Sequence, residues 1–117
     1  MPDIRALIAQ AVDYGAQYGI GSLNEWQRTV FLIAEAETLS DMGGSFYDDY
    51  TAEAIEHEFA AAFARIGAHG IAALFAQHAR QPDNFAAEQQ LAQAVSERAG
   101  YDYDRIAAYV RSACEAA

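Results

Sequence analysis

Apolar side chains recur at helical spacing along most of this chain. In the N-terminal segment they follow the order i, i+3, i+4, i+7, i+8 and i+11, which places them on one face of a helix. These positions are Ile4, Leu7, Ile8, Ala11, Val12 and Gly15. The pattern predicts a helix that starts after Pro2 and ends in the segment Tyr18-Gly19-Ile20-Gly21.

A second helix is expected to begin at a capping box formed by residues 22–25. In that box the Ser22 hydroxyl accepts a hydrogen bond from the Glu25 amide while the Glu25 side chain reaches back. The apolar residues that follow cover more than one face, which is typical of a helix at the centre of a bundle. They are Trp26, Val30, Phe31, Leu32, Ile33 and Leu39. A break is expected at residues 41–45, where paired glycines allow positive φ angles.

The clearest helical pattern is the third one. Thr51 is a suitable N-cap, because its hydroxyl can accept from a free backbone N–H of the first turn. An apolar stripe with spacing i, i+4, i+7, i+8 and i+11 follows, formed by Ile55, Phe59, Ala62, Phe63 and Ile66. Gly67 is expected to end this helix as its C′ residue.

Three shorter helical patterns follow. The fourth contains Ile71, Leu74, Phe75 and His78, and Pro82 is expected to stop it. Asp83 or Asn84 caps the fifth, which turns Leu91, Val95 and Phe85 inward and ends at Gly100. Asp102 caps the sixth, which presents Ile106, Tyr109, Val110 and Ala113.

No stretch alternates between apolar and polar residues strictly enough to predict a strand. There is also no internal repeat and no linker long enough to divide the chain. We therefore predict an all-α fold, a compact single-domain bundle of five to six helices spanning residues 1–117. A globular chain of this length has an expected radius of gyration of about 13 Å.

The charge is concentrated in one part of the chain. The formal net charge is −10, and eight carboxylates with no arginine or lysine among them lie between Arg28 and Arg65. They are Glu35, Glu37, Asp41, Asp48, Asp49, Glu53, Glu56 and Glu58. Because like charges repel one another in the folded state, such a block favours a function that needs it, such as binding a basic protein surface.

Composition excludes several other functions. Nucleic-acid binding depends largely on Lys and Arg, whereas this chain has seven such residues against seventeen acids, so no nucleic-acid partner is expected. The sequence has neither a signal-peptide start nor an apolar run of the roughly 18 residues of a membrane span, so we expect a cytoplasmic protein without a membrane partner. Cys114 is the only cysteine and cannot form an internal disulfide.

The chain contains only incomplete versions of the sequence motifs that are typical of catalytic and metal-binding sites. His57-Glu58 lacks the second histidine of the zincin pattern, and no histidine follows a glutamate at the spacing of di-iron bundles. Gly19-Ile20-Gly21 lacks the third glycine of a dinucleotide loop. We predict no catalytic residue, no metal ligand and no cofactor, and the chain is expected not to be an enzyme.

Glu37 is an unusual acid because the helical wheel places it on the apolar face of the second helix. An unpaired charge buried there would be costly. Since Glu37 lies near the helix end, we expect its carboxylate to reach water or the Gly43–Gly44 amides.

Two segments of this chain resemble a bacterial all-α family of unknown function that includes an acidic DNA-mimic protein. They are Asp41-Met42-Gly43-Gly44-Ser45-Phe46-Tyr47 and Ala64-Arg65-Ile66-Gly67-Ala68. The similarity covers roughly residues 26–80. Met42 replaces the asparagine of the family's turn and Ser45 replaces its phenylalanine. The resemblance implies a compact helical fold and, for at least one member, carboxylates that bind a DNA-binding protein in place of phosphates.

The leading hypothesis is a non-enzymatic, acidic interaction module. Its partner would be a basic protein, either a DNA-binding regulator or a nuclease-type toxin, and the module itself a monomer or homodimer. The predicted contact residues are Asp41, Tyr47, Asp48, Asp49, Tyr50, Glu53 and Glu56, the tyrosines serving as interface anchors or as caps of the core. The alternative is a small metal-binding or carboxylate-dependent enzyme that uses Glu35, Glu37, Glu53 and His57.

Overall fold

A computed structural model describes residues 3–43, 45–81 and 83–116 of the chain. The side chains of Asp48, Asp49 and Ala116 are not part of this description. The helix start after Pro2, the turn at Gly44 and the stop at Pro82 were predicted from residues that lie outside the described ones.

Every regular element in the described ranges is helical, and no strand occurs there. In chain order the elements are α1 (Ile4–Tyr18), η1 (Ile20–Ser22), α2 (Glu25–Asp41), α3 (Phe46–Asp49), α4 (Ala52–Ala54), η2 (Ile55–Phe59), α5 (Ala60–Arg65), α6 (His69–Arg80), α7 (Phe85–Ser96) and α8 (Tyr103–Ala116). The elements α4, η2 and α5 form one continuous helix. With the single turns η1 and α3 set aside, the described chain forms six helices, which confirms the predicted all-α bundle.

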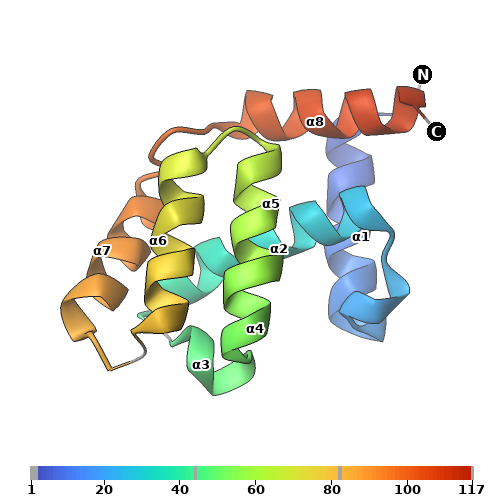
Figure 1. Cartoon of the computed structure of the whole chain (residues 1–117). Helices are drawn as coiled ribbons and strands as arrows, with labels where there is room; N and C mark the ends of the chain where they lie inside the picture. The colour runs from blue at the N-terminus through green and yellow to red at the C-terminus, as the bar shows by residue number, and fades with distance from the viewer. Residues whose placement is uncertain (1–2, 44, 82, 117) are drawn as a thin grey trace.

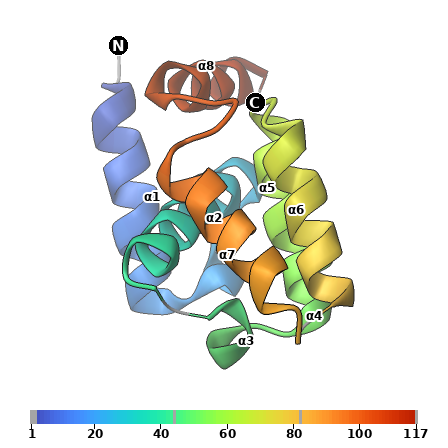
Figure 2. The same ribbon diagram turned by 90° about the vertical axis from the view of Figure 1, so that its left-hand side faces the viewer.

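Helix α2 runs through the middle of the bundle, as its apolar pattern predicted (Figure 1). It contacts α1, η2, α5, α7 and α8. The continuous helix α4–η2–α5 packs along α6, while α8 crosses one end of the molecule and α3 lies at the opposite end (Figure 2). The radius of gyration is 13.7 Å. No helix among the described residues is long and apolar enough to cross a membrane.

The core is built around aromatic rings from four parts of the chain. Phe59 and Phe63 of the third predicted helix stack on Phe75 of α6. Their ring centroids lie 5.4 and 5.3 Å, respectively, from the centroid of Phe75. Phe46 of α3 meets Phe59 and Phe75 edge to face, and Tyr101 meets Phe63 in the same way. The residues of the predicted stripe are all buried, so the helical pattern identified the core face of this helix correctly.

The predicted N-caps of the later helices are confirmed, whereas α7 ends at Ser96, four residues before the predicted end at Gly100. Thr51 accepts a hydrogen bond from the Ala54 amide, Asn84 accepts one from Ala87, and Asp102 accepts one from Arg105. Gly67 has a φ of 84° after α5, a conformation that glycine adopts without a steric penalty.

Two local predictions are wrong. The cap of α2 is Asn24, which exchanges hydrogen bonds with Gln27, whereas Ser22 belongs to the turn η1 and donates to the Gly19 carbonyl. The capping box is therefore present two residues later than expected. Phe85 is 67% exposed rather than directed inward, because it is the first residue of α7 and lies beyond the stripe formed by Leu91 and Val95.

The third helix contains a π-helical turn that the periodicity did not predict. In η2 the Ala60 amide donates to the carbonyl of Ile55, five residues earlier. One extra residue is therefore inserted between α4 and α5 without ending the helix. Such insertions are found frequently at functional sites.

Gly15 lies where α1 crosses α2, and we expect Gly15→Ala to destabilise the fold. An added Cβ would lie 2.7 Å from Phe31 Cδ2 and 2.9 Å from Leu23 Cδ1, and both of these side chains are buried. Overpacking costs about 1–3 kcal/mol and opposes the gain of about 1 kcal/mol in helix propensity, so a net loss of unfolding free energy is expected.

The matched control is Gly70→Ala in α6, where nothing lies within 4 Å of the added Cβ. This change should leave stability unchanged or raise it by up to about 1 kcal/mol. Urea unfolding of both variants measures the difference. Equal stability changes at the two glycines would show that the contact at Gly15 is not tight.

Candidate functional site

The predicted contact residues come from the last turn of α2, from α3 and the residue after it, and from the first turns of the continuous helix α4–η2–α5. We call this surface the acidic end and define it as Asp41, Tyr47, Asp48, Asp49, Tyr50, Glu53 and Glu56. Helix α3 and the start of α4 lie at the end of the molecule opposite to α8 (Figures 1 and 2). Asp41 contacts Ser96, the last residue of α7, whereas Glu56 contacts Arg80, the last residue of α6. The side chains of Asp48 and Asp49 lie outside the described structure.

Local sequence explains why the chain turns back at this place. Met42 and Gly43 end α2, and Gly43 has a φ of 71°. Ser45 accepts from the Tyr47 amide at the start of α3, and Thr51 caps α4. Two successive capped turns therefore place α3 and the start of α4 in one short segment directly after α2.

Asp41 and Glu53 are the most accessible described acids of this surface. Both residues are exposed, and no described cation lies within 4.0 Å of either carboxylate. The Asp41 carboxylate accepts one hydrogen bond, from Ser96 Oγ at 2.8 Å. Glu53 lies in the first turn of α4, where the helix dipole favours a negative charge.

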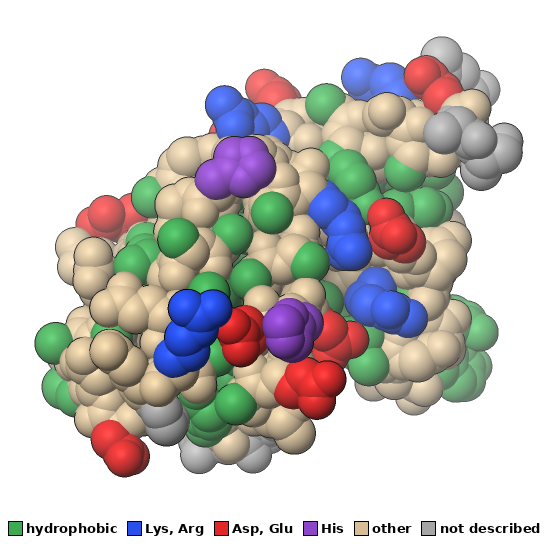
Figure 3. Space-filling model, viewed as in Figure 1, with side chains coloured by type: hydrophobic (Ala, Val, Ile, Leu, Met, Phe, Trp, Pro, Cys, Tyr) green, Lys and Arg blue, Asp and Glu red, His purple; other side chains and the backbone are tan. Residues whose placement is uncertain are grey.

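Glu56 differs from them because it is neutralised by an arginine from another helix. Arg80 donates to Glu56 Oε1 through Nη2 at 2.9 Å and through Nε at 3.1 Å. Side chains of both charges accordingly lie next to each other on this face of the molecule (Figure 3). Glu56 therefore contributes less negative potential to the surface than its position in the sequence suggests.

The two tyrosines of the acidic end hold α3 against the bundle. The Tyr47 hydroxyl donates to the carbonyls of His78 and Ala79 at the end of α6, at 2.9 and 2.8 Å. Burial and the nearby charge of Glu56 raise the pKa of Tyr47. The Tyr50 hydroxyl donates to Glu35 at 2.8 Å, and its ring packs on Phe59. Both rings cap the core, which is one of the two roles considered for them; a role in an interface stays a prediction.

Glu37 has two partners that the sequence did not reveal. Its Oε2 accepts hydrogen bonds from Arg98 Nε at 2.7 Å and from the Tyr101 hydroxyl at 2.8 Å. Burial and this hydrogen bond raise the pKa of Tyr101. The Glu37 side chain keeps 22% of its surface exposed, as expected near a helix end, while the Gly44 amide lies outside the described residues. The pairing itself was not predicted, because it depends on the chain after α7 returning to α2 with two donors.

The four residues of the alternative metal-binding site do not converge. Glu35 receives the Tyr50 hydroxyl, Glu37 faces Arg98 and Tyr101, Glu53 is exposed, and His57 lines a separate pocket near the start of α2. No group of three or more His, Cys, Asp or Glu side chains suited to hold a metal ion occurs among the described residues.

No protein-family model, curated protein or solved structure matches this chain. The resemblance to the family that includes a DNA-mimic protein therefore stays a prediction from residues 41–47 and 64–68. The function has to be argued from the chemistry of the surface.

Proposed function

We propose that this protein is a non-enzymatic binding module whose acidic end docks a basic surface of a partner protein. The observation that supports this most strongly is the imbalance of charge between α2 and α5. Arginines pair with Glu37 and Glu56, whereas no described cation lies within 4.0 Å of Glu35, Asp41, Glu53 or Glu58. A surplus of negative charge therefore stays in this segment after folding.

Electrostatics explains how such a surface would be used. Opposite potentials on two proteins accelerate their encounter and disfavour wrong partners more than they raise affinity. Exposed carboxylates such as Asp41 and Glu53 can provide this steering, because they are free to meet arginine or lysine side chains. The tyrosines beside them present rigid, partly apolar area, which is common at the energetic centre of interfaces.

The same chemistry fits two kinds of basic partner. For a DNA-binding regulator, the carboxylates would take the place of the phosphates that its arginines and lysines normally meet. For a nuclease-type toxin, they would cover the positively charged surface that binds its nucleic-acid substrate. Both would be recognised through the charge of the acidic end.

Charge reversal tests the proposal. We expect the triple variant Asp48→Arg, Asp49→Arg and Glu53→Arg to lose most of the partner binding, because it replaces attraction by repulsion at the acidic end. Glu56 is left unchanged, since reversing it would break its ion pair with Arg80. The measurement is affinity capture from the native host, followed by binding kinetics with the captured protein.

The control variant reverses three exposed acids of α1 and α8, Asp13→Arg, Asp104→Arg and Glu115→Arg. It changes the net charge by the same amount, so any difference between the two variants reports the position of the charges. An acidic captured partner, or equal losses in the two variants, would refute the proposed binding surface.

A further inference from the structure

A small polar pocket lies between the start of α2 and the continuous helix α4–η2–α5, and none of its lining residues belongs to the acidic end. Its volume is about 270 Å³. It is lined by Leu23, Asn24, Glu25, Arg28, Leu32, His57, Glu58 and Arg65. Two guanidinium groups and an imidazole thus meet at one cavity with the carboxylates of Glu25 and Glu58, in a chain whose charge is strongly negative overall.

Arg28 is the group in this pocket whose hydrogen-bonding capacity is least used. Its Nε is buried and has no hydrogen-bond partner among the described residues, and Nη2 makes only a long 3.4 Å hydrogen bond to the Leu23 carbonyl. No described carboxylate lies within 4.0 Å of it. Because Nε has almost no accessible surface, a ligand in the pocket would meet the outer Nη groups of Arg28, of which only Nη2 makes a hydrogen bond among the described residues. An acceptor supplied there would use donors of a charged group that the fold leaves unsatisfied.

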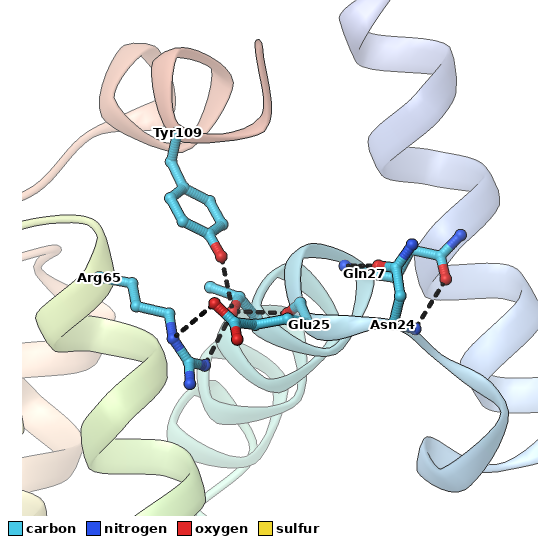
Figure 4. A network of polar contacts seen from close by, with 6 residues as sticks. Asn24, Glu25, Gln27, Arg65 and Tyr109 are labelled. Carbon is cyan, nitrogen blue, oxygen red and sulfur yellow. Dashed lines mark hydrogen bonds and ion pairs between the residues drawn. The ribbon is translucent and has the colours of Figure 1, made fainter. Parts of the chain in front are cut away.

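Arg65 is in contrast held in place by its neighbours. Its Nη1 donates to Thr29 Oγ1 at 3.1 Å, and Thr29 in turn is bonded to the Glu25 carbonyl and lies 3.3 Å from the Tyr109 hydroxyl (Figure 4). Its Nε lies 3.7 Å from the Glu25 carboxylate, which is itself 75% exposed. These contacts hold a second guanidinium at the pocket that Arg28 lines, so Arg65 is already positioned before a ligand binds.

The backbone around the pocket is also unusual. His57 and Glu58 belong to the π-helical turn η2, the irregular element within the third helix. Without the extra residue of this turn, both side chains would be rotated relative to α5 and Arg65. The irregularity therefore sets which side chains face the pocket, and its position agrees with the common occurrence of π-turns at functional sites.

We propose that this pocket binds a small molecule bearing an oxyanion, a carboxylate or a phosphate, with Arg28 as its principal donor. A guanidinium binds the two oxygens of such a group with paired, charge-assisted hydrogen bonds. Arg65 and His57 add donors, while Leu23 and Leu32 provide apolar contact. Pockets for drug-sized ligands begin at about 300 Å³, so the ligand is a small organic acid or phosphate ester. This inference is independent of the acidic end.

Nuclear magnetic resonance of the arginine Nε–H groups tests this directly. Succinate and inorganic phosphate are titrated separately into the wild-type protein, with chloride at matched ionic strength as reference. We expect the Arg28 Nε–H signal to shift in a saturable way with one or both anions. The anion that binds more tightly then identifies the carboxylate or the phosphate class.

Arg28→Gln is expected to weaken the binding by at least about tenfold, since it removes charge-assisted hydrogen bonds. The control is Arg105→Gln, which removes an exposed arginine that is not part of this pocket. It should bind as the wild type does, and thermal unfolding of both variants verifies that they are folded. A response to the anions no larger than that to chloride, or equal binding by the two folded variants, would overturn the proposal.

Discussion

Replacing Phe59 with alanine is expected to lower the free energy of unfolding by about 3–5 kcal/mol. Phe59 has no exposed surface, and its ring lies against Phe46, Phe75 and Tyr50 at centroid distances of 5.3, 5.4 and 4.8 Å. Truncation would leave a cavity at the point where α3, α6 and the third helix meet. Since domains of this size are stable by only about 5–15 kcal/mol, the loss is a large part of the total.

Phe85→Ala is the matched control for this prediction. Phe85 is 67% exposed, so the same chemical change at this position should alter stability by no more than about 0.5 kcal/mol. Chemical denaturation of both variants provides the comparison. Similar losses for the two phenylalanines would contradict the assignment of Phe59 to the centre of the core.

His78 is expected to make the stability of the fold depend on pH. The side chain is completely buried against Phe46 and Tyr47, and neither ring nitrogen has a hydrogen-bond partner in the part of the chain that the structure describes. Burial lowers the pKa of His78, an effect that the charge of Glu88 opposes only in part. The folded protein therefore favours neutral His78, whereas the unfolded chain takes up a proton near the ordinary histidine pKa of about 6.5.

The sign of the effect follows from proton linkage. Below pH of about 6.5 the unfolded state binds more protons at this residue, so stability falls as the pH decreases, by at most about 1.4 kcal/mol per pH unit for one proton. The loss stops once the pH falls below the lowered pKa of the folded state. Above pH of about 6.5 the unfolded chain no longer takes up this proton, so the stability does not depend on the titration of His78.

His78→Phe removes the titrating group and should reduce the loss of stability between neutral and mildly acidic pH. Because it also removes two unsatisfied polar atoms from the core, it is expected to cost little stability at pH 7. His69→Gln is the control. His69 is exposed, so this variant keeps His78 and should keep the pH dependence of the wild type. Denaturation curves at several pH values test this, and an unchanged pH dependence in His78→Phe would refute it.

The features that were predictable from the sequence are those encoded by neighbouring residues. The stripe from Ile55 to Ile66 and the caps at Thr51 and Asp102 depend only on spacing and on a side chain reaching its own helix. The cap of α2 was placed two residues too early, because Ser22-x-x-Glu25 and Asn24-x-x-Gln27 both have capping-box spacing. The turn η1 includes Ser22 and leaves Asn24 as the cap of α2, and no simple sequence pattern predicts this turn.

Features that depend on how helices meet were not predictable. Arg98 and Tyr101 reach Glu37 from more than 60 positions away in the chain, and Arg80 reaches Glu56 from another helix. Helical periodicity gives the face of each helix but not which residues oppose it. The sequence therefore suggested that all eight carboxylates between Arg28 and Arg65 are unpaired, whereas in the fold arginines pair with Glu37 and Glu56. The pocket at Arg28 was missed for the same reason, since its side chains come from separate helices.

The central claim, that the acidic end binds a basic partner, is tested most directly by the salt dependence of the association rate. Exposed charges are screened over about 8 Å at physiological ionic strength, so attraction through this surface should weaken as salt is added. We predict that the association rate constant of the wild type falls steeply with salt, and that the Asp48→Arg, Asp49→Arg, Glu53→Arg variant associates slowly with a flat or inverted dependence. A rate that is insensitive to salt, or equally steep slopes for the two proteins, would contradict the account.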